Sequence, residues 1–209
     1  MLHTETIAPA TLGLLKRLMQ DECLSRFVLV GGTSLALQFG HRISVDLDLF
    51  TDVGFDENRM RTRLEMEYGL VTEYLDRETL KGEINGVQID CIAHKYAWVE
   101  PPLEMDGIRI ASLKDIAAMK LNAIAGNGTR IKDFIDLAYL STHFSLSQML
   151  GFYEAKYHAS TIMPLKAITY FDEINLEEPI RMIGGAFSWK KVAKRLLDMQ
   201  RHTDRIFDT

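Results

Sequence analysis

Hydrophobic positions change their spacing along the chain near residue 105. Before this point, apolar residues form short runs that are typical of strands, with helical segments between some of them, and Asn85-Gly86 is a hairpin turn signal. After it, they recur at the spacing of amphipathic helices. The expected strands cover 27–30, 45–50, 71–75, 79–84, 87–93 and a short run at 108–111, and the expected later helices cover 113–124, 131–142, 146–158 and 189–206.

This change of pattern predicts an α+β protein. Residues 1–107 are expected to form a core with a mixed sheet and flanking helices, and residues 108–209 a mainly helical part that closes the active-site cleft. The segment Met1–Met19 has leucines at helical spacing and lacks a small-residue cleavage site, so it predicts an amphipathic helix rather than a secretory signal.

The composition is that of an ordinary globular protein, with 47% hydrophobic and 25% charged residues. No window approaches the roughly 20 apolar residues of a membrane span, so no membrane association and a cytoplasmic location are expected. Cys23 and Cys91 are too few and too far apart to suggest a disulfide framework or a zinc site. The net charge of −5 argues against a protein that coats nucleic acid. A basic patch near the C-terminus is either a solvated helix face or a contact for an RNA end; it comprises Lys190, Lys191, Lys194, Arg195, Arg201 and Arg205.

The segment 27–50 carries the candidate chemistry. Its apolar strand breaks at Gly31-Gly32 and is followed by an expected short helix over about 34–39, which Thr33 or Ser34 can cap. Two glycines let the backbone approach a ligand closely, and free amides at a helix start favour an anion such as a triphosphate. A Gly-Gly pair alone would also suit any tight strand-to-helix turn.

The next strand strengthens the case, because Asp46 and Asp48 alternate with apolar residues and must share one face. Same-face neighbours lie about 6.6 Å apart along a strand. Two such carboxylates can converge on metal ions spaced about 3.5 to 4 Å apart. The alternative is the solvated face of an edge strand. Asp90 interrupts the apolar run at 87–93 and offers a third carboxylate, and two metal ions held by three carboxylates suit nucleotidyl transfer.

These motifs resemble the core of the DNA polymerase beta-type nucleotidyltransferases: Gly-Gly or Gly-Ser, nine to thirteen residues, then Asp-x-Asp or Asp-x-Glu. Here thirteen residues separate Gly32 from Asp46. More closely, the run GGTSLALQFGHRISVDLDLF resembles the AbiEii/AbiGii toxin family, nucleotidyltransferase-like partners in bacterial toxin-antitoxin and phage-defence systems. The likeness extends through Lys120 to Asp136 and covers most of the chain except its last third.

Lys120 lies in the apolar arc of the helix expected at 113–124, so it must either extend outward or reach an anion. The anion favoured here is the triphosphate. Asp133 and Asp136 share a face of the next helix, although Asp133 at a helix start also suits the helix dipole. Members of the AbiEii-like family carry a similar Lys followed by a Lys-Asp-x-x-Asp block. The resemblance implies that Lys120 contacts phosphates and that Asp133 or Asp136 organises the site.

Two arginines complete the candidate set. Arg42 lies between the glycine turn and the carboxylates, where it can pair with Asp46 or Asp48 or contact a phosphate. Relatives often have an arginine where this chain has Asn127, and Arg130 is the candidate substitute.

The resulting hypothesis is a nucleotidyltransferase that moves a nucleoside monophosphate from a nucleoside triphosphate to an acceptor and releases pyrophosphate. RNA, such as a tRNA end, is the acceptor that the resemblance suggests, and a cognate antitoxin is the suggested protein partner. Two alternatives stand beside it: a non-catalytic nucleotide-binding toxin that acts through a protein partner, and an aminoglycoside-type nucleotidyltransferase. The expected nucleotide-binding residues are Gly31, Gly32, Thr33, Ser34, Arg42, Lys120 and Arg130. The expected ligands of Mg²⁺ (or Mn²⁺) are Asp46, Asp48 and Asp90. The expected catalytic residues are Asp46, Asp48, Asp90, Lys120, Asp133 and Asp136.

Overall fold

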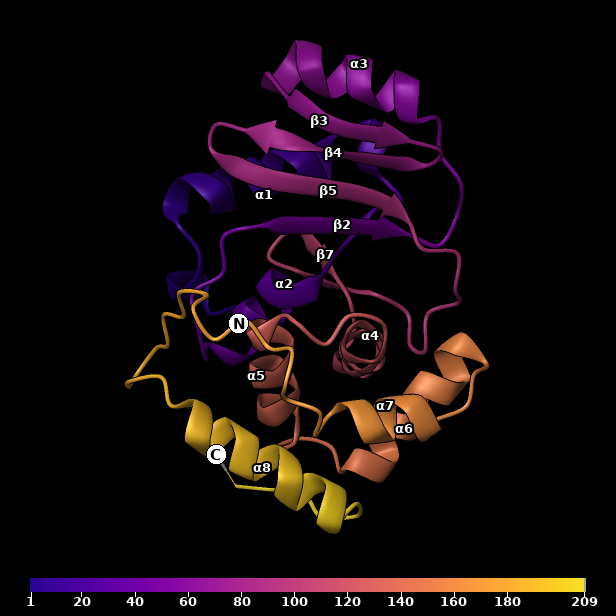
Figure 1. Cartoon of the computed structure of the whole chain (residues 1–209). Helices are drawn as coiled ribbons and strands as arrows, with labels where there is room; N and C mark the ends of the chain where they lie inside the picture. The colour runs from indigo at the N-terminus through magenta and orange to yellow at the C-terminus, as the bar shows by residue number, and fades with distance from the viewer. Residues whose placement is uncertain (209) are drawn as a thin grey trace. The chain divides into compact units, whose positions relative to one another are not determined.

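The computed structural model describes residues 1–208 and divides into two compact units, Met1–Ala111 and Ser112–Thr209. Figure 1 shows strands in the first unit, and helices joined by loops in the second. The boundary predicted after residue 107 would separate the strand at 108–110 from the sheet to which it belongs, and the first unit therefore extends to Ala111.

The first unit is built on a seven-stranded mixed sheet in the order β3-β4-β5-β2-β1-β7-β6. The β2–β5 and β1–β7 pairs are parallel, and the other neighbours are antiparallel. The strands are β1 (Val28–Val30), β2 (Leu47–Thr51), β3 (Val71–Asp76), β4 (Thr79–Ile84), β5 (Val87–Ala93), β6 (Leu103–Met105) and β7 (Ile108–Ile110).

The expected strands are all present, and the hairpin between β4 and β5 is confirmed. Asn85 and Gly86 both have positive φ, 52° and 80°, as a two-residue turn between twisted strands requires. This turn pairs Ile84 with Val87 and sets the register of the whole hairpin. The short strand β6 was not expected from the sequence.

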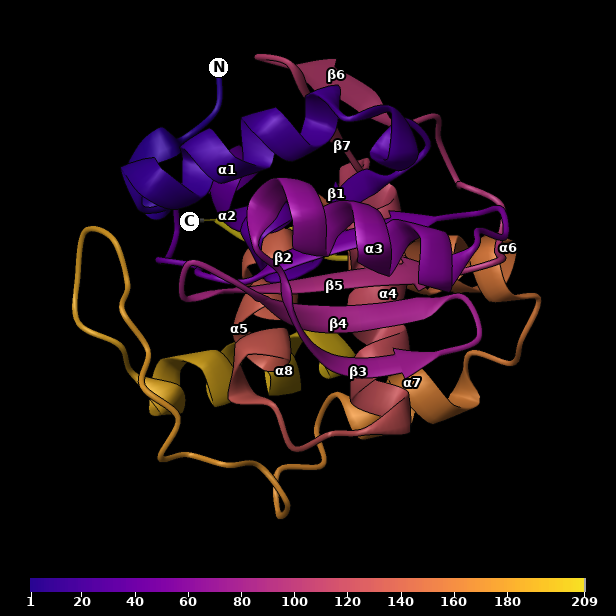
Figure 2. The ribbon, with the colours of Figure 1, turned by 90° about the horizontal axis from the view of Figure 1, so that it is seen from above.

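Helices in the first unit cover the apolar face of the sheet. They are α1 (Pro9–Gln20), α2 (Gly31–Phe39) and α3 (Glu57–Tyr68), with 3₁₀ turns at Thr4–Thr6 and Glu22–Leu24. In Figure 2, α1 and α3 both lie above β5, β4 and β3 in the picture, on one side of these strands. Buried leucines and methionines from these helices form one core with Leu47, Leu49, Ile89 and Cys91 of the sheet. Because side chains alternate along a strand, the residues between these point to the opposite face.

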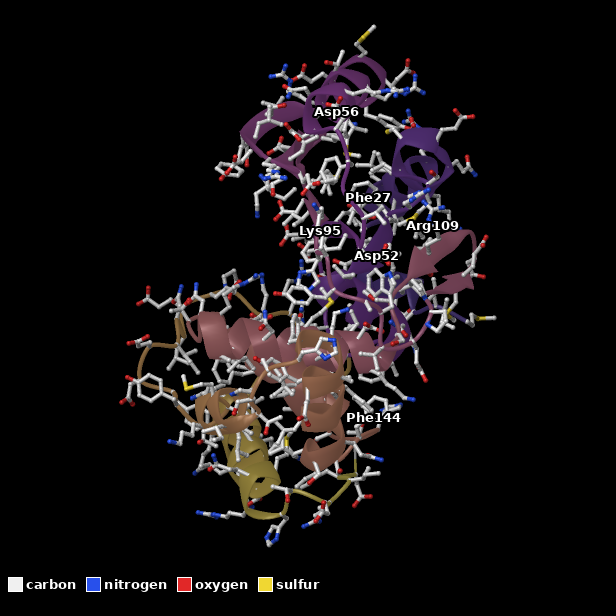
Figure 3. All side chains as sticks on the ribbon, turned by 90° about the vertical axis from the view of Figure 1, so that its right-hand side faces the viewer. Phe27, Asp52, Asp56, Lys95, Arg109 and Phe144 are labelled. Atoms are coloured by element: carbon white, nitrogen blue, oxygen red, sulfur yellow. The ribbon has the colours of Figure 1, made fainter. Side chains whose placement is uncertain are left out.

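One arginine ties the chain around β1 to the rest of the sheet. The Arg109 guanidinium donates to the carbonyls of Met19, Leu24 and Phe27, at 2.8, 2.9 and 2.9 Å. Figure 3 labels Arg109 and Phe27 in this part of the molecule. These bonds fasten the segment that enters β1 to the neighbouring β7, and so they fix the strand that leads to the glycine turn.

The second unit is a helical bundle around α4 (Figure 1). The helix α4 packs against α5, α6 and α7, and α5 also contacts α8. The expected helices are present, although α8 ends five residues before the predicted 206, and the short α7 was not expected. The helices are α4 (Leu113–Gly126), α5 (Ile131–Leu140), α6 (Leu146–Tyr157), α7 (Ile162–Ala167) and α8 (Trp189–Arg201). Within residues 1–208, no helix has the length and apolar character to cross a membrane.

Candidate active site

The glycine turn is the point where β1 ends and α2 begins, and its backbone is packed closely by two charged side chains. Gly31 has a φ of +69°, and a Cβ placed on it would lie 2.1 Å from Oδ2 of Asp48. A Cβ on Gly32 would lie 2.3 Å from Nη2 of Arg42. Both approaches require glycine, because a side chain at either position would occupy the space of the carboxylate or the guanidinium.

The start of α2 differs from the prediction. The helix begins at Gly31 rather than near residue 34, Val30 occupies the N-cap position, and no side chain caps this end. The predicted capping by Thr33 or Ser34 is therefore wrong. A capping side chain must come from the residue before the first helical one, whereas both hydroxyls already lie inside the helix. The first turn of α2 is thus left without a side-chain cap beside two glycines.

The Thr33 hydroxyl has a different function, which is to hold the loop that leads to the carboxylates. Its Oγ1 lies 2.8 Å from Oγ of Ser44 and also donates to the main-chain carbonyl of Asp46. Ser34 is fully buried and contacts the Gln38 side-chain amide. These hydroxyls therefore shape the turn from within, and only the backbone of the first helical turn remains as a candidate surface for phosphate.

Arg42 is buried, with a relative exposure of 2%, although it lies in the loop between α2 and β2. Its Nη1 donates to the carbonyl of Ile43 at 3.2 Å, and its guanidinium packs against Gly32. The structure thus places this predicted residue directly at the glycine turn. A buried guanidinium beside the first helical turn adds positive charge where an anionic ligand would lie.

The carboxylates are brought together by the parallel pairing of β2 with β5. Asp48 and Asp90 are register partners on these neighbouring strands, and both are partly exposed on the face opposite the apolar core. Asp46 precedes β2 by one residue and is also partly exposed. The register therefore brings Asp48 and Asp90 to neighbouring positions on the sheet, and their predicted sharing of a metal site with Asp46 stays a prediction.

The metal prediction stays a prediction. As the side chains of residues 1–208 are placed, no group of three or more His, Cys, Asp or Glu residues is arranged to hold a metal ion. The donor chemistry nevertheless suits Mg²⁺, which is commonly bound through one or two carboxylates and the phosphates of a substrate. Two adjacent, partly exposed carboxylates beside a glycine cradle offer this donor set.

Lys81 belongs to the same row of side chains and was not among the residues predicted from the sequence. It lies on β4 directly opposite Asp90, and its ammonium forms an ion pair with Oδ2 of that aspartate. Asp48, Asp90 and Lys81 therefore occupy matching positions on three consecutive strands. The Asn85-Gly86 turn was the signal that could have identified this partner, because it fixes which residues of the hairpin face each other.

In the second unit, Lys120 is held by Asp133 and Asp136, the two aspartates predicted from the sequence to organise the site. Its Nζ lies 2.7 Å from Oδ1 of Asp133 and 2.6 Å from Oδ2 of Asp136. All three side chains are at least nine-tenths buried. Oδ2 of Asp133 is buried and makes no hydrogen bond within the described part of the chain. Lys120 does reach anions, namely the protein's own carboxylates, and its predicted phosphate contact stays a prediction.

Arg130, the other candidate in this unit, is exposed at the N-cap position of α5. Its backbone forms an isolated bridge with Asn175. Its predicted contact with the nucleotide stays a prediction.

A second buried ion pair supports α4 and was missed from the sequence. Nζ of Lys156 lies 2.8 Å from Oδ1 of Asp115, and both side chains are completely buried. Ser112 caps α4 by accepting from the Asp115 amide at 3.1 Å, and its hydroxyl donates to Oδ2 of Asp115 at 2.7 Å. This network joins α6 to the start of the helix that carries Lys120.

The mixed sheet and the two-glycine turn at the end of β1 belong to the polymerase beta-like fold of nucleotidyltransferases. The sequence profile of one family, "Nucleotidyl transferase AbiEii toxin, Type IV TA system", matches residues 13–202. The chain belongs to this AbiEii nucleotidyltransferase family, as the sequence resemblance predicted.

Several known proteins are similar to the chain. An uncharacterized protein of Aquifex aeolicus (strain VF5) is 32% identical over 158 residues, which cover 72% of this chain and 76% of that protein. A crystal structure of a candidate nucleotidyltransferase from H. pylori has a TM-score of 0.57 at 17% identity and covers 94% of this chain and 96% of its own. The crystal structure of JHP933 from Helicobacter pylori has a TM-score of 0.52 at 18% identity, with coverages of 95% and 93%. At these identities the two structures show a shared fold.

Proposed function

We propose that this nucleotidyltransferase moves a nucleoside monophosphate from a nucleoside triphosphate to a hydroxyl of an RNA acceptor, in a reaction that requires Mg²⁺ or Mn²⁺. The observation that carries the proposal is the packing of the Asp48 carboxylate against the Gly31 backbone, with Asp90 beside it on the next strand. This arrangement supports the proposal, because carboxylate oxygens are the donors that Mg²⁺ prefers and a helix start attracts phosphate.

The triphosphate is proposed to bind at the first turn of α2. Backbone amides at a helix start attract phosphate oxygens, and glycine allows them to approach the backbone without obstruction. The buried Arg42 guanidinium beside Gly32 adds a fixed positive charge. Ser34 and Thr33 contribute through their backbone, since their side chains are committed to the turn itself.

The acceptor hydroxyl is proposed to be activated at the carboxylate row. A divalent ion, when bound, would polarise the reacting phosphate and help ionise the hydroxyl. Asp48 and Asp90, with Asp46, would hold that ion through their carboxylates, and Asp90 is the candidate acceptor of the hydroxyl proton. The acceptor oxygen forms a bond to the α-phosphorus while the bond from that phosphorus to the bridging oxygen breaks, so pyrophosphate leaves with its electron pair.

For Lys120 we propose the phosphate contact that the family resemblance implies, with Asp133 and Asp136 holding its ammonium in place. Lys120→Ala is expected to weaken triphosphate affinity more than tenfold, about 1.4 kcal/mol or more, in calorimetric titrations. This variant also leaves two buried carboxylates without their lysine, so the Lys120→Met/Asp133→Asn double variant, which removes one charge of each sign, is the folding control. Wild-type affinity in a folded Lys120 variant would remove this residue from the site.

The test of the function is transfer of label from nucleoside triphosphates to total RNA in the presence of Mg²⁺. Asp48→Asn is expected to abolish transfer. Asp106→Asn, the same substitution in an exposed turn between β6 and β7, is expected to leave it unchanged. Tight nucleotide binding without turnover would instead support a toxin that acts through a protein partner. Label found on aminoglycosides but not on RNA would identify a small-molecule transferase.

Membership of a toxin family also leads us to propose a cognate antitoxin as partner. A small winged-helix regulator encoded by the neighbouring gene would support this. Co-expression should then relieve growth inhibition by the wild-type chain, whereas the Asp48→Asn variant should not inhibit growth at all.

A further inference from the structure

We propose that Lys81 is a built-in counter-cation of the carboxylate row, and that a divalent ion and the Lys81 ammonium compete for Asp90. The idea rests on the proposed function, because it assumes that the row binds a metal ion. Lys81 is a positioning residue that lies outside the Gly-Gly and Asp-x-Asp motif, and it sets the metal affinity of the row.

The geometry places Lys81 at the end of a three-strand row. On β4 it is the register partner of Asp90, which on β5 is the register partner of Asp48. The Lys81 ammonium pairs with Oδ2 of Asp90, so it occupies one of the oxygens that a divalent ion would need. The tight hairpin turn at Asn85-Gly86 fixes this pairing, because a shift by one residue would send Lys81 to the opposite face.

The charges explain why a cation is needed there before a metal ion binds. Asp48 and Asp90 lie side by side on adjacent strands, where like charges destabilise a sheet. The Lys81 ammonium offsets one of the two negative charges. A divalent ion bound to the same carboxylates would offset their negative charge more strongly, but it would also repel the Lys81 ammonium beside it. Metal binding and the Lys81–Asp90 pair are therefore mutually unfavourable.

Exposure explains why the exchange is feasible. The side chains of Lys81 and Asp90 are 39% and 24% exposed, so the ammonium can turn into solvent. Ion pairs of this exposure contribute little to stability, and releasing one costs little. A lysine is also long and flexible enough to move without disturbing β4. The pair is thus suited to hold the row together while no metal ion is bound and to open when one binds.

The test is Mn²⁺ affinity without nucleotide, measured by electron paramagnetic resonance or calorimetry. Lys81→Met is expected to bind Mn²⁺ about threefold more tightly or better, because the competing cation is gone. Lys81→Arg keeps the charge and should stay near wild type. The matched control is Lys95→Met, which breaks a comparable exposed pair with Glu78 at 2.6 Å and changes the net charge equally. The Lys95→Met substitution should leave the Mn²⁺ affinity unchanged; Lys95 is labelled in Figure 3.

The outcomes separate this inference from the proposed function. If wild-type protein binds no Mn²⁺, or if Asp48→Asn binds it equally well, the metal site and the inference both fail. If Mn²⁺ binds in an Asp48-dependent manner but Lys81→Met binds it no more tightly, the inference alone is overturned. The same holds if Lys95→Met tightens binding as much as Lys81→Met, since the effect would then reflect net charge only.

Competition is reciprocal, which provides a second readout on the wild-type chain. Adding Mg²⁺ should raise the rate at which the Lys81 amine is reductively methylated, measured by peptide mass spectrometry. The rate at Lys95 should stay constant, and Asp48→Asn should remove the increase at Lys81. A Lys81 reactivity that is independent of Mg²⁺ would show that the ion pair persists when metal binds.

Discussion

Gly31→Ala offers a direct test of the close packing between the glycine turn and Asp48. Gly31 has a φ of +69°, and Gly69 at the end of α3 has a φ of +70°. Apart from the two adjacent residues, no atom of residues 1–208 lies within 4 Å of a Cβ placed on Gly69, whereas a Cβ on Gly31 would lie 2.1 Å from Oδ2 and 2.9 Å from Cγ of Asp48. The same substitution at these two glycines therefore differs mainly in the contact with the carboxylate.

The expected magnitudes follow from these two environments. Alanine in a left-handed backbone conformation costs about 1–2 kcal/mol, and this is the whole expected effect of Gly69→Ala. At Gly31 the added methyl group must also displace the Asp48 side chain, and such overpacking typically costs a further ~1–3 kcal/mol. Gly31→Ala should therefore lower the free energy of unfolding by about 2–5 kcal/mol.

Urea denaturation of both variants measures these changes, and a double-mutant cycle assigns the difference. In an Asp48→Ala background the extra cost of Gly31→Ala should largely disappear, because the displaced oxygen is absent. Nucleotidyl transfer should be lost in Gly31→Ala and kept in Gly69→Ala. If the two glycine variants are equally destabilised, the reasoning about the carboxylate contact is wrong.

Two further predictions concern charges away from the carboxylate row. Lys156→Met should destabilise the second unit by about 3–5 kcal/mol in urea denaturation, because it leaves the buried Asp115 carboxylate without the Lys156 ammonium. Adding Asp115→Leu to this variant should recover much of the lost stability. Burial alone would raise the pKa of Asp21, but hydrogen bonds from the Cys23 amide and the Tyr68 hydroxyl outweigh it, and the pKa is lowered. Because the pKa is lower in the folded state, the ionised carboxylate stabilises the fold at every pH above the unfolded-state pKa of about 3.9. This stabilisation is lost as the pH falls through the lower pKa of the folded state. Asp21→Asn should therefore cost roughly 1–3 kcal/mol at pH 7, and the gap to wild type should close in acid; a gap that is constant with pH would contradict the assignment.

The hairpin shows how much of the site the sequence could specify. Asn85-Gly86 predicts a two-residue turn, and the structure confirms it. Counting three residues back from Ile84 and three forward from Val87 gives Lys81 opposite Asp90. This ion pair was therefore predictable from the order of residues alone, once the turn was taken as fixing the register.

Other features depend on contacts between distant segments and carry no local signal. The parallel pairing of β2 with β5 places Asp48 beside Asp90, yet these strands are separated by α3, β3 and β4. The sequence indicated that each aspartate interrupts an apolar strand, but not that they are register partners. The capping of α2 was mispredicted for a related reason, because Gly31 starts the helix earlier than the position of the hydroxyl residues suggested.

The two lysines that face candidate site carboxylates differ in exposure, and this difference predicts different behaviour when ligands bind. Lys120 is buried with two aspartates, and breaking such a cluster is costly, so its ammonium is expected to stay where it is. Lys81 shares a partly exposed pair that costs little to open. A divalent ion that needs an additional carboxylate oxygen should therefore displace the Lys81 ammonium from Asp90. The ion pair between β4 and β5 should open when the ion binds, whereas the buried cluster on α4 and α5 should stay intact.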